Sequence, residues 1–455
     1  MIKKVLIANR GEIAVRIIRT CKEMNIKTVA IYSTADRDAL HTQIADEAVC
    51  VGGPKSMDSY LNMNNIIQAA CNSGCDAIHP GFGFLSENPK FARLITECGL
   101  IFIGPDADII DKMGNKNVAR KMMTDAGLTI IPGSKEVIKS VAIGINMAKE
   151  IGYPVIVKAS NGGGGRGMRI VWTEKEFESS FKSAKAEAKA CFGDDDVYME
   201  KYLVNPKHIE VQVMGDKHGN VVHLYERDCS FQRRNQKMIE EAPCHMLNNN
   251  VRNKMLEDAV RACKYVGYNS VGTIEFLLDA NDNYYFMEMN TRIQVEHPVT
   301  EMITGIDIVK QQILIADGKV LGYKQEDILC KGFAIECRIN AEDIKKDFAP
   351  SVGKIKFLHV PGGRDVRSES AVYCGYDIPP FYDSMILKLI TFAPTRLECI
   401  RKMRSTLSEL VIDGIETNTE FHYLVLHNPK FISGKYNTGF VQEYIEELKK
   451  IGDVI

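Results

Sequence analysis

The first hundred residues alternate short β-branched runs with amphipathic segments. KKVLIAN is followed by GEIAVRIIRTCKEMN, and KTVAIYS, NMNNIIQAACNSG and DAIHPGFG continue the pattern. Alternating strand and helix periods predict βαβ units on a parallel sheet that helices cover on both faces. The first strand-to-helix turn reads Asn9-Arg10-Gly11-Glu12 and lacks the G-x-G-x-x-G spacing of dinucleotide sites. We therefore expect a doubly covered sheet without a nicotinamide cofactor.

The pattern changes after Asp106, where one long helix is expected to run to a glycine at position 127. A small unit follows, with a helix from Val141, a strand YPVIVKAS, a glycine loop, a strand MRIVW, a helix through Lys189 and a strand VYMEKYL. Runs such as HIEVQVMGD and VGTIEFLLD then predict antiparallel strands. After Gly318, further strands and two terminal helices predict a third, α+β domain.

Length and composition limit the class of protein. The chain has 455 residues, 45% of them apolar, and a formal net charge of −2, which fits a soluble protein of about three domains and argues against a nucleic-acid coat. Its apolar runs are too short to cross a membrane or to act as a signal peptide. The 13 cysteines include no CxxC pair, which favours a reducing, cytoplasmic compartment.

A glycine-rich segment lies between two expected strands, VIVKA and RIVW. It holds five glycines, at Gly162, Gly163, Gly164, Gly165 and Gly167. Without Cβ atoms their backbone N–H groups can approach an anion closely, and Lys158 adds a cation nearby. A Walker loop is excluded because no G-K-[ST] follows. We favour a hairpin lid over phosphates, and the alternative is a plain solvent loop.

Two glutamates interrupt neighbouring apolar runs. Glu275 lies in VGTIEFLL and Glu288 in YYFMEMN, and the polar turn between them predicts a hairpin in which the two carboxylates face each other. Like charges in this position need a cation between them, and paired carboxylates suit Mg²⁺ with phosphate oxygens completing its shell. The alternative is a pair of solvated glutamates on an exposed face.

A polar row continues beyond Glu288. If the chain stays extended, Glu288, Asn290, Arg292, Gln294 and Glu296 share one face. The guanidinium of Arg292 and the amide of Gln294 could hold a small oxyanion, with Glu296 as a nearby base. Glu296 could equally cap the helix that begins at PVTEMITG.

Positive charge is concentrated in ERDCSFQRRNQK. Arg227, Arg233, Arg234 and Lys237 could form an anion site or a solvated loop, and the residues alone leave both open. Lys116, just after Gly114, could be an ordinary lysine on a helix surface.

Taken together, these segments resemble the biotin carboxylase subunit of biotin-dependent carboxylases, which are ATP-grasp enzymes. The resemblance runs from IANRGEIAVRIIR through HPGFGFLSEN, ERDCSFQRRNQK and MNTRIQVEHPVTE to YDSMILKLI, nearly the whole chain. It implies a Rossmann-like N-terminal domain over residues 1–113. An ATP-grasp domain over 114–329, with a mobile lid at about 131–203, and a C-terminal α+β domain over 330–455 are expected to follow.

The resemblance also implies roles for individual residues. Lys116, Lys158 and His208 would contact the nucleotide phosphates under the glycine lid, and Glu200, Lys201, Leu203, Gln232 and Leu277 would hold the adenine and ribose. Mg²⁺ or Mn²⁺ would bind Glu275 and Glu288, with Asn290 adjacent. Bicarbonate would meet Lys237, Arg292, Gln294 and the Val295 backbone, with Glu296 as base and Arg338 stabilising the biotin enolate.

The implied reaction is an ATP-dependent ligation that carboxylates biotin through carboxyphosphate, the first half-reaction of acetyl-CoA or pyruvate carboxylase. The chain lacks an Ala-Met-Lys-Met biotin acceptor, so a biotin carboxyl carrier protein and a carboxyltransferase are expected partners. A homodimer and a setting in fatty acid biosynthesis are further expectations, and the choice of final carboxyl acceptor would belong to the carboxyltransferase. Two competing hypotheses are a different ATP-grasp carboxylate–amine ligase and a nucleotide sensor without turnover.

Three residues depart from the pattern of this family. Phe82 replaces a tyrosine whose hydroxyl could meet biotin, and Asn235 replaces a histidine expected near the nucleotide. Leu387 replaces a glycine, where we expect local repacking.

Overall fold

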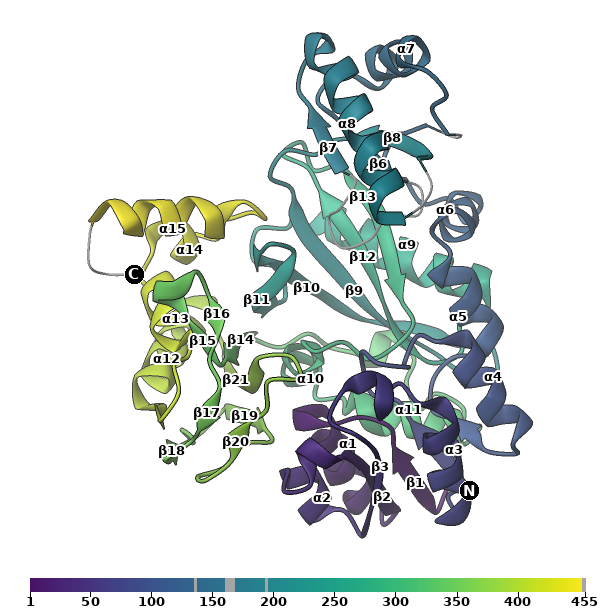
Figure 1. Ribbon diagram of the computed structural model, residues 1–455, viewed down its shortest axis with the longest axis vertical. Coiled ribbons are helices and arrows are strands. Elements are labelled where there is room, and N and C mark those ends of the chain that lie inside the picture. The colour runs from purple at the N-terminus through teal and green to yellow at the C-terminus, as the bar shows by residue number, and fades with distance from the viewer. Residues whose placement is uncertain (135–136, 160–167, 193–194, 452–455) are drawn as a thin grey trace. The chain divides into compact units, whose positions relative to one another are not determined.

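The computed structural model describes residues 1–134, 137–159, 168–192 and 195–451 (Figure 1). These residues belong to two compact units. The first comprises Met1–Leu128, Lys207–Phe276 and Glu288–Ile455, and the second comprises Thr129–Pro206 and Leu277–Met287. The glycines at positions 162–167 lie outside the described residues. The three-domain division expected from the sequence stays a prediction.

The N-terminal sheet is parallel, as the sequence predicts. Its order is β3 (Glu47–Gly52), β2 (Lys27–Ser33), β1 (Lys4–Ile7), β4 (Ala77–His79) and β5 (Ile101–Phe102). Alternate strand residues bury on opposite faces. Val5 and Ile7 pack with α1 (Gly11–Glu23), whereas Leu6 packs with α3 (Met63–Asn72) and α4 (Pro89–Glu97).

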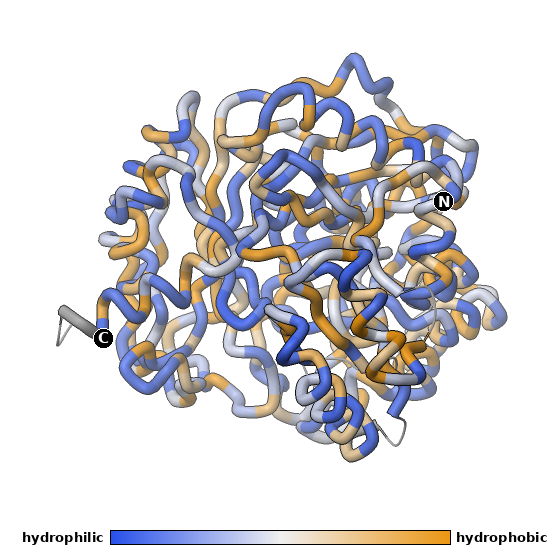
Figure 2. The backbone as a smooth tube through the Cα atoms, turned by 90° about the horizontal axis from the view of Figure 1, so that it is seen from above, coloured by the Kyte–Doolittle hydropathy of each residue, from blue (hydrophilic) through white to orange (hydrophobic). Residues whose placement is uncertain are grey.

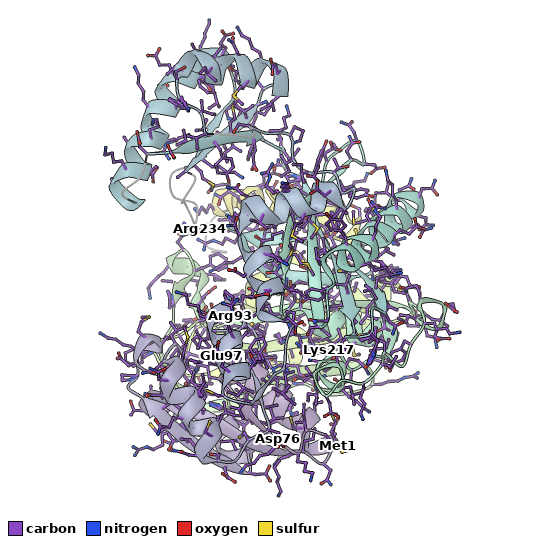
Figure 3. The ribbon with its side chains drawn as sticks, turned by 90° about the vertical axis from the view of Figure 1, so that its right-hand side faces the viewer. Met1, Asp76, Arg93, Glu97, Lys217 and Arg234 are labelled. Carbon is purple, nitrogen blue, oxygen red and sulfur yellow. The ribbon has the colours of Figure 1, made fainter. Side chains whose placement is uncertain are left out.

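Asp76 fixes the start of this sheet. Its carboxylate accepts hydrogen bonds from the backbone N–H groups of Lys3 at 2.7 Å and Lys4 at 2.9 Å (Asp76 is labelled in Figure 3). The amino group of Met1 pairs with Asp317 at 3.3 Å. Strand β1 is therefore held in place directly from its first residues.

The single long helix expected from Asp106 is wrong. Two helices form instead, α5 (Ala107–Gly114) and α6 (Lys116–Asp125). Asn115 between them is extended, with φ −84° and ψ 107°, and its side chain accepts from the N–H groups of Asn117 and Val118. A capping asparagine directly after a glycine ends one helix and starts the next.

An eight-stranded sheet carries most of the first unit. Its order is β13 (Tyr284–Asn290), β12 (Val271–Leu278), β9 (Lys207–Gly215), β10 (Val221–Arg233), β11 (Gln236–Ala242), β14 (Phe333–Asn340), β21 (Met385–Ala393) and β19 (Val366–Ser370). The pairs from β9 to β19 are antiparallel, which confirms the expectation for β9 and β10. Helices α9 (Asn249–Val266), α10 (His297–Thr304) and α11 (Ile308–Ala316) complete this region.

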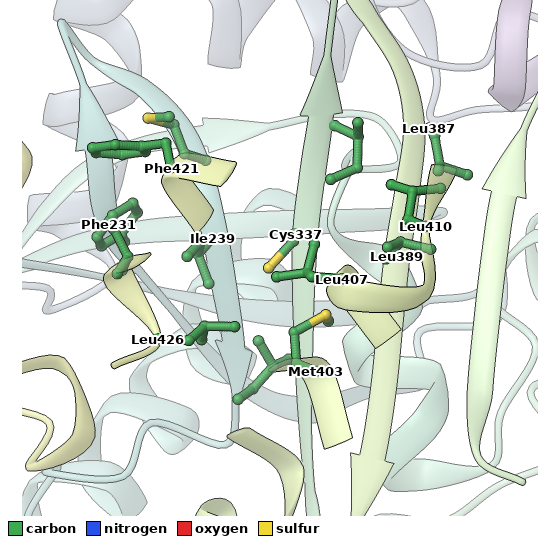
Figure 4. Close-up of a cluster of buried hydrophobic side chains, with 14 of the residues drawn as sticks. Phe231, Ile239, Cys337, Leu387, Leu389, Met403, Leu407, Leu410, Phe421 and Leu426 are labelled. Carbon is green, nitrogen blue, oxygen red and sulfur yellow. The ribbon is translucent and has the colours of Figure 1, made fainter. Parts of the chain in front are cut away.

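The chain after β21 holds more helices than the two expected. Up to Ile451, where the described residues end, four are present: α12 (Arg396–Glu409), α13 (Thr419–Val425), α14 (Pro429–Ile432) and α15 (Phe440–Ile451). They cover one face of β11, β14 and β21, where Ile239, Cys337 and Leu389 meet Met403 and Phe421 (Figure 4). The shorter elements are α2 (Leu40–Ile44), β15 (Glu342–Asp343), β16 (Ala349–Pro350), β17 (Gly353–Lys354), β18 (Phe357–His359), β20 (Asp377–Ile378) and β22 (Val411–Asp413).

The second unit has the predicted order of elements. Helix α7 (Val141–Ile151) is followed by β6 (Val155–Ala159), β7 (Met168–Val171), α8 (Glu174–Phe192) and β8 (Val197–Lys201). Strands β6 and β7 are antiparallel, which confirms the hairpin on either side of the glycine segment. Phe177 and Phe181 of α8 pack against this small sheet.

Polar and apolar residues alternate along the chain (Figure 2). Among the described residues, no helix combines the length and the apolar character that a membrane span requires.

Candidate active site

Strand β9 supplies a row of polar side chains that sequence reasoning largely missed. His208, Glu210 and Gln212 alternate with Ile209 and Val211, and all are buried. The Arg227 guanidinium of β10, opposite Glu210 in the register, donates to Glu210 and to Gln212. The sequence could have predicted this row, because polar residues at every second position of HIEVQVMG lie on one face of a strand.

Lys237 lies at the centre of three buried carboxylates. Its Nζ is 2.5 Å from Glu210 Oε2, 2.6 Å from Glu296 Oε1 and 3.0 Å from Glu275 Oε1. Burial alone would lower the pKa of Lys237, but its anionic neighbours raise the pKa well above its usual range. The ammonium therefore stays charged, and it is suited to hold an anion beside Glu296.

The Glu296 side chain does not cap the helix that follows it. Glu296 occupies the N-cap position of α10, yet its side chain makes no capping hydrogen bond. It instead accepts from Lys237 and, at 2.9 Å, from Arg338. Although burial opposes its charge, Lys237, Arg338 and Arg227 hold the pKa of Glu296 well below its ordinary value.

Arg338 is held by two carboxylates on the same face of the sheet. It projects from β14 and contacts Glu240 at 2.5 Å as well as Glu296. Burial raises the pKa of Glu240 to about 7, partly offset by Arg338, and the charge of Glu296 adds to the rise. Glu240 was not foreseen from the sequence.

The row that follows β13 does not stay extended as expected. The strand ends at Asn290, and the next six residues form no strand. The side chains nevertheless converge, because Arg292 donates to Gln294 at 2.5 Å and to Asn290 at 3.0 Å. Glu87, another residue the sequence did not suggest, accepts from Arg292 Nε at 2.9 Å.

Glu275 contacts both Asn290 and His208. Asn290 Nδ2 donates to Glu275 at 2.9 Å, and His208 lies 2.8 Å from the other oxygen of the same carboxylate. Glu288 is exposed, and its pKa is raised by partial desolvation and by the charge of Glu275, while Lys116 opposes the rise. Direct opposition of the two glutamates stays a prediction.

This donor set fits Mg²⁺ or Mn²⁺. Hard carboxylate oxygens are the ligands these ions prefer, and a cation would relieve the repulsion between Glu275 and Glu288. Two other groups among the described residues have ligand spacing: His208, Glu210 and Glu275, and Glu210, Cys229 and Glu296. Lys237 pairs with carboxylates of both groups, and its partners include Glu275 of the predicted metal set. A metal site at Glu275, Glu288 and Asn290 stays a prediction.

The candidate nucleotide residues are divided between the two units. His208 and Gln232 belong to the first, and Lys158, Glu200, Lys201, Leu203 and Leu277 belong to the second. Within the second unit, Lys158 Nζ lies 2.5 Å from Glu200 Oε2. Lys201 Nζ donates to the carbonyls of Gly152 at 2.8 Å and Tyr153 at 2.9 Å. The candidate lid glycines lie outside the described residues.

The basic cluster is divided between the interior and the surface. Arg227 is fully buried on β10, so it does not belong to a solvated loop. Its guanidinium is satisfied by Glu210 and the polar side chains around it. Arg233 and Arg234 instead pair with Asp347, and Arg234 is largely exposed (labelled in Figure 3).

The three unusual residues have clear local environments. Asn235 and Arg234 have φ values of 64° and 49° in the β10–β11 turn, a conformation that asparagine tolerates well. Leu387 is fully buried in the apolar core beside α12. Phe82 is half-buried, and its carbonyl accepts from Asn9 at 2.7 Å.

Family models match three consecutive segments of the chain. Residues 1–110 match the biotin carboxylase N-terminal domain, and residues 115–324 match the ATP-binding domain of the carbamoyl-phosphate synthase L chain. Residues 336–443 match the biotin carboxylase C-terminal domain.

Curated relatives and solved structures agree with these matches. Biotin carboxylase 1 of Bacillus subtilis is 56% identical over 98% of this chain and 99% of its own length. Biotin carboxylase of Haemophilus influenzae is 55% identical over 97% and 99%. The Campylobacter jejuni biotin carboxylase–β,γ-ATP complex superposes with a TM-score of 0.92 at 50% identity, covering 97% of this chain and 99% of that one. The Hydrogenobacter thermophilus 2-oxoglutarate carboxylase biotin carboxylase domain dimer, solved with MgADP, ADP and bicarbonate, gives 0.91 at 52%, covering 98% of both chains.

Proposed function

This chain belongs to the biotin carboxylase family, and we propose that it is an ATP-dependent ligase that carboxylates biotin with bicarbonate. The observation that carries this proposal is the Glu296 carboxylate held between Lys237 at 2.6 Å and Arg338 at 2.9 Å. Glu296 could accept a proton from a small anion such as bicarbonate that is held by Lys237. Arg338, on the other side of Glu296, could stabilise an enolate. Arg292 adds a planar guanidinium close to Gln294.

The first step is activation of bicarbonate, which is a poor electrophile. Lys237, Arg292, Gln294 and the Val295 amide would hold it, and Glu296 would accept its proton as the γ-phosphate is transferred to give carboxyphosphate. Glu296 is ionised at neutral pH, so it is ready to accept. A bound bicarbonate that loosens its pairing with Lys237 and Arg338 would raise its pKa toward that of a useful base.

A divalent ion at Glu275, Glu288 and Asn290 would supply charge neutralisation for the triphosphate when bound. Lys116, Lys158 and His208 would contact the phosphates beneath the glycines at 162–167. Glu200, Lys201, Leu203, Gln232 and Leu277 would hold the adenine and ribose. The supporting observation is that these residues are matched within the ATP-binding family model.

The second step transfers the carboxyl group. Carboxyphosphate would break down to CO₂ and phosphate, the phosphate would remove the N1′ proton of biotin, and Arg338 would stabilise the enolate that attacks CO₂. Phe82 would approach biotin without offering a hydroxyl. Closure of the lid over residues 131–203 would exclude water from the intermediate.

The proposed function also implies partner proteins and an oligomeric state. The biotin would be attached to a separate biotin carboxyl carrier protein, and carboxyltransferase subunits would use the product in a carboxylase of the acetyl-CoA or pyruvate type. We expect a cytoplasmic homodimer built from three domains at 1–113, 114–329 and 330–455. Support comes from the Hydrogenobacter thermophilus domain, which is a dimer. The solved biotin carboxylase subunit of pyruvate carboxylase, 51% identical over 98% of this chain with a TM-score of 0.87, supports the assignment to such a carboxylase.

The test is ATP hydrolysis measured with and without bicarbonate and free biotin. We expect bicarbonate-dependent turnover that biotin stimulates and a chelator abolishes. Arg292→Ala and Glu296→Ala should lower this turnover about a hundredfold or more while thermal unfolding stays cooperative. Arg234→Ala removes an exposed arginine of the β10–β11 turn and is the matched control.

Two results would favour the competing hypotheses. Turnover that requires an amine acceptor and ignores biotin would indicate another carboxylate–amine ligase. Nucleotide binding with no turnover under any of these conditions would indicate a sensor.

A further inference from the structure

A fully buried lysine lies beneath the anion-binding segment. Lys388 projects from β21, where its register partners are Arg338 on β14 and Glu369 on β19. Its Nζ donates to the backbone carbonyl of Val295 at 2.7 Å and pairs with Glu12 of α1 at 3.1 Å. A buried charge of this kind is costly unless its partners are fixed, so the two contacts constrain where Val295 lies.

A fully buried histidine holds the preceding peptide. His297 Nδ1 lies 2.7 Å from the carbonyl oxygen of Gln294. A carbonyl can only accept, so Nδ1 carries the proton. Burial, and then the charges of Lys388, Arg16 and Arg367, keep the pKa of His297 well below its ordinary value, so the ring is neutral. Its Nε2 has no partner among the described residues.

These two contacts determine which way two successive peptide groups point. In a trans peptide the carbonyl oxygen and the following N–H point in opposite directions. With the Gln294 carbonyl turned toward His297, the Val295 N–H points away from that ring. With the Val295 carbonyl turned toward Lys388, the backbone N–H of Glu296 points away from the lysine. No acceptor for the Val295 N–H is found among the described residues, which leaves this donor available to an anion.

We propose that Lys388 and His297 are positioning residues for bicarbonate, holding the carbonyls of Val295 and Gln294 from the buried side so that the Val295 amide and the Glu296 carboxylate face the substrate. This inference rests on the proposed function and adds residues to its site. Glu12 pairs with Lys388 at 3.1 Å and serves as its counterion. Neither positioning residue touches the substrate.

The main test compares KM for bicarbonate with KM for ATP in the Lys388→Met variant of the full chain. Methionine keeps the length of the side chain and removes its donor. We expect KM for bicarbonate to rise about tenfold or more, as loss of one charged hydrogen bond predicts, while KM for ATP changes less than about twofold. An unchanged KM for bicarbonate in folded protein would overturn the proposal for Lys388.

The histidine is tested by rescue. His297→Leu should raise KM for bicarbonate about tenfold, whereas His297→Asn, which retains an N–H near the position of Nδ1, should restore it to within about threefold of wild type. Equal effects of leucine and asparagine would show that His297 only fills space, and would overturn its role as a donor.

Arg396→Met is the matched control. Arg396 is also buried and pairs with Glu241 at 2.5 Å, but it contacts α14 residues and not the segment 294–296. We expect it to lower the unfolding midpoint without changing KM for bicarbonate. If it raises that KM as much as Lys388→Met does, the lysine effect reflects general destabilisation and the proposal fails.

A double variant and the wild-type protein serve as additional controls. If Lys388→Met does not fold because Glu12 is left unpaired, the Glu12→Gln/Lys388→Met double variant removes both charges and is measured in the same way. Its unchanged KM for bicarbonate would equally overturn the proposal. Absence of bicarbonate-dependent, biotin-stimulated turnover in the wild type would instead refute the proposed function itself.

Discussion

The two faces of β11, β14 and β21 differ sharply although they come from the same strands. Ile239, Cys337 and Leu389 lie on the face that α12 and α13 cover, and that face is apolar (Figure 4). Their neighbours Glu240, Arg338 and Lys388 are turned to the other face, where charges are paired in the interior. Because strand side chains alternate, one sheet supplies both the core and the site.

The difference teaches which face stabilises the fold. A fully buried aliphatic side chain contributes about 1.5 to 3 kcal/mol, whereas a buried ion pair is often no more stabilising than an apolar replacement. We therefore expect the apolar face to account for most of the stability, and the paired charges of the other face to contribute little to it. Loss of one member of a charged pair is costly all the same, because it leaves its partner buried and uncompensated.

The largest expected effect is on the charged face. Lys237→Met leaves Glu210, Glu275 and Glu296 without their shared cation. We expect the free energy of unfolding to fall by about 3 to 5 kcal/mol and bicarbonate-dependent ATP hydrolysis to be lost. Urea unfolding and an ATPase assay measure the two effects, and Lys112→Met on the exposed side of α5 is the control. Wild-type stability in Lys237→Met would show that the carboxylates do not need this lysine.

The next effect separates stability from activity. Leu389→Ala opens a cavity on the apolar face and should lower the free energy of unfolding by about 2 to 5 kcal/mol. Because Leu389 faces away from Arg338, kcat per folded molecule should stay within about twofold of wild type. A much larger loss of kcat in protein shown to be folded would mean that the two faces are mechanically coupled.

A smaller effect should appear in the pH dependence of stability. The pKa of Glu240 is raised to about 7, so the folded chain holds this proton more tightly than the unfolded chain, whose ordinary value is 4.5. The resulting stabilisation is complete below about pH 4.5 and is lost as pH rises through about 7. Glu240→Gln should therefore flatten the decline of the unfolding midpoint between pH 5 and pH 8. An identical decline in variant and wild type would contradict this, and Glu97→Gln on exposed α4 is the control.

The smallest effect is expected outside both faces. Arg234 pairs with Asp347 at 2.8 Å, but both side chains are more than half exposed. Arg234→Ala should change the free energy of unfolding by less than about 0.5 kcal/mol. A loss above 1 kcal/mol in urea unfolding would indicate that the β10–β11 turn contributes more than its contacts suggest.

Local patterns predicted much of this molecule. Period-two and helical spacing predicted the parallel N-terminal sheet and the hairpin of β6 and β7. The same spacing singled out Glu275 and Arg292 as candidate site residues. Prediction failed for contacts between residues far apart in the sequence, because no local pattern contains them. Glu87 contacts Arg292 across 205 positions, and buried Arg227 is paired with Glu210 on the neighbouring strand.

Short-range errors had a different cause. The break at Asn115 depends on a single residue, whose side chain caps helix α6. The helical spacing of apolar residues continues on both sides of Asn115, so the whole segment was predicted as one helix. The end of β13 at Asn290 likewise follows from side chains that converge on Glu275, which an extended template does not include.

The contact between Lys388 and Val295 has a consequence for the order in which the molecule is made. These residues are 93 positions apart, so a nascent chain that has just emerged as far as Glu296 holds the proposed anion ligands of β11 and residues 292–296 but not the strand that we propose orients them. We therefore expect no activity during translation until β21 has been synthesised and has docked. A ribosome stalled before that strand should release a polypeptide with an N-terminal sheet and no competent catalyst.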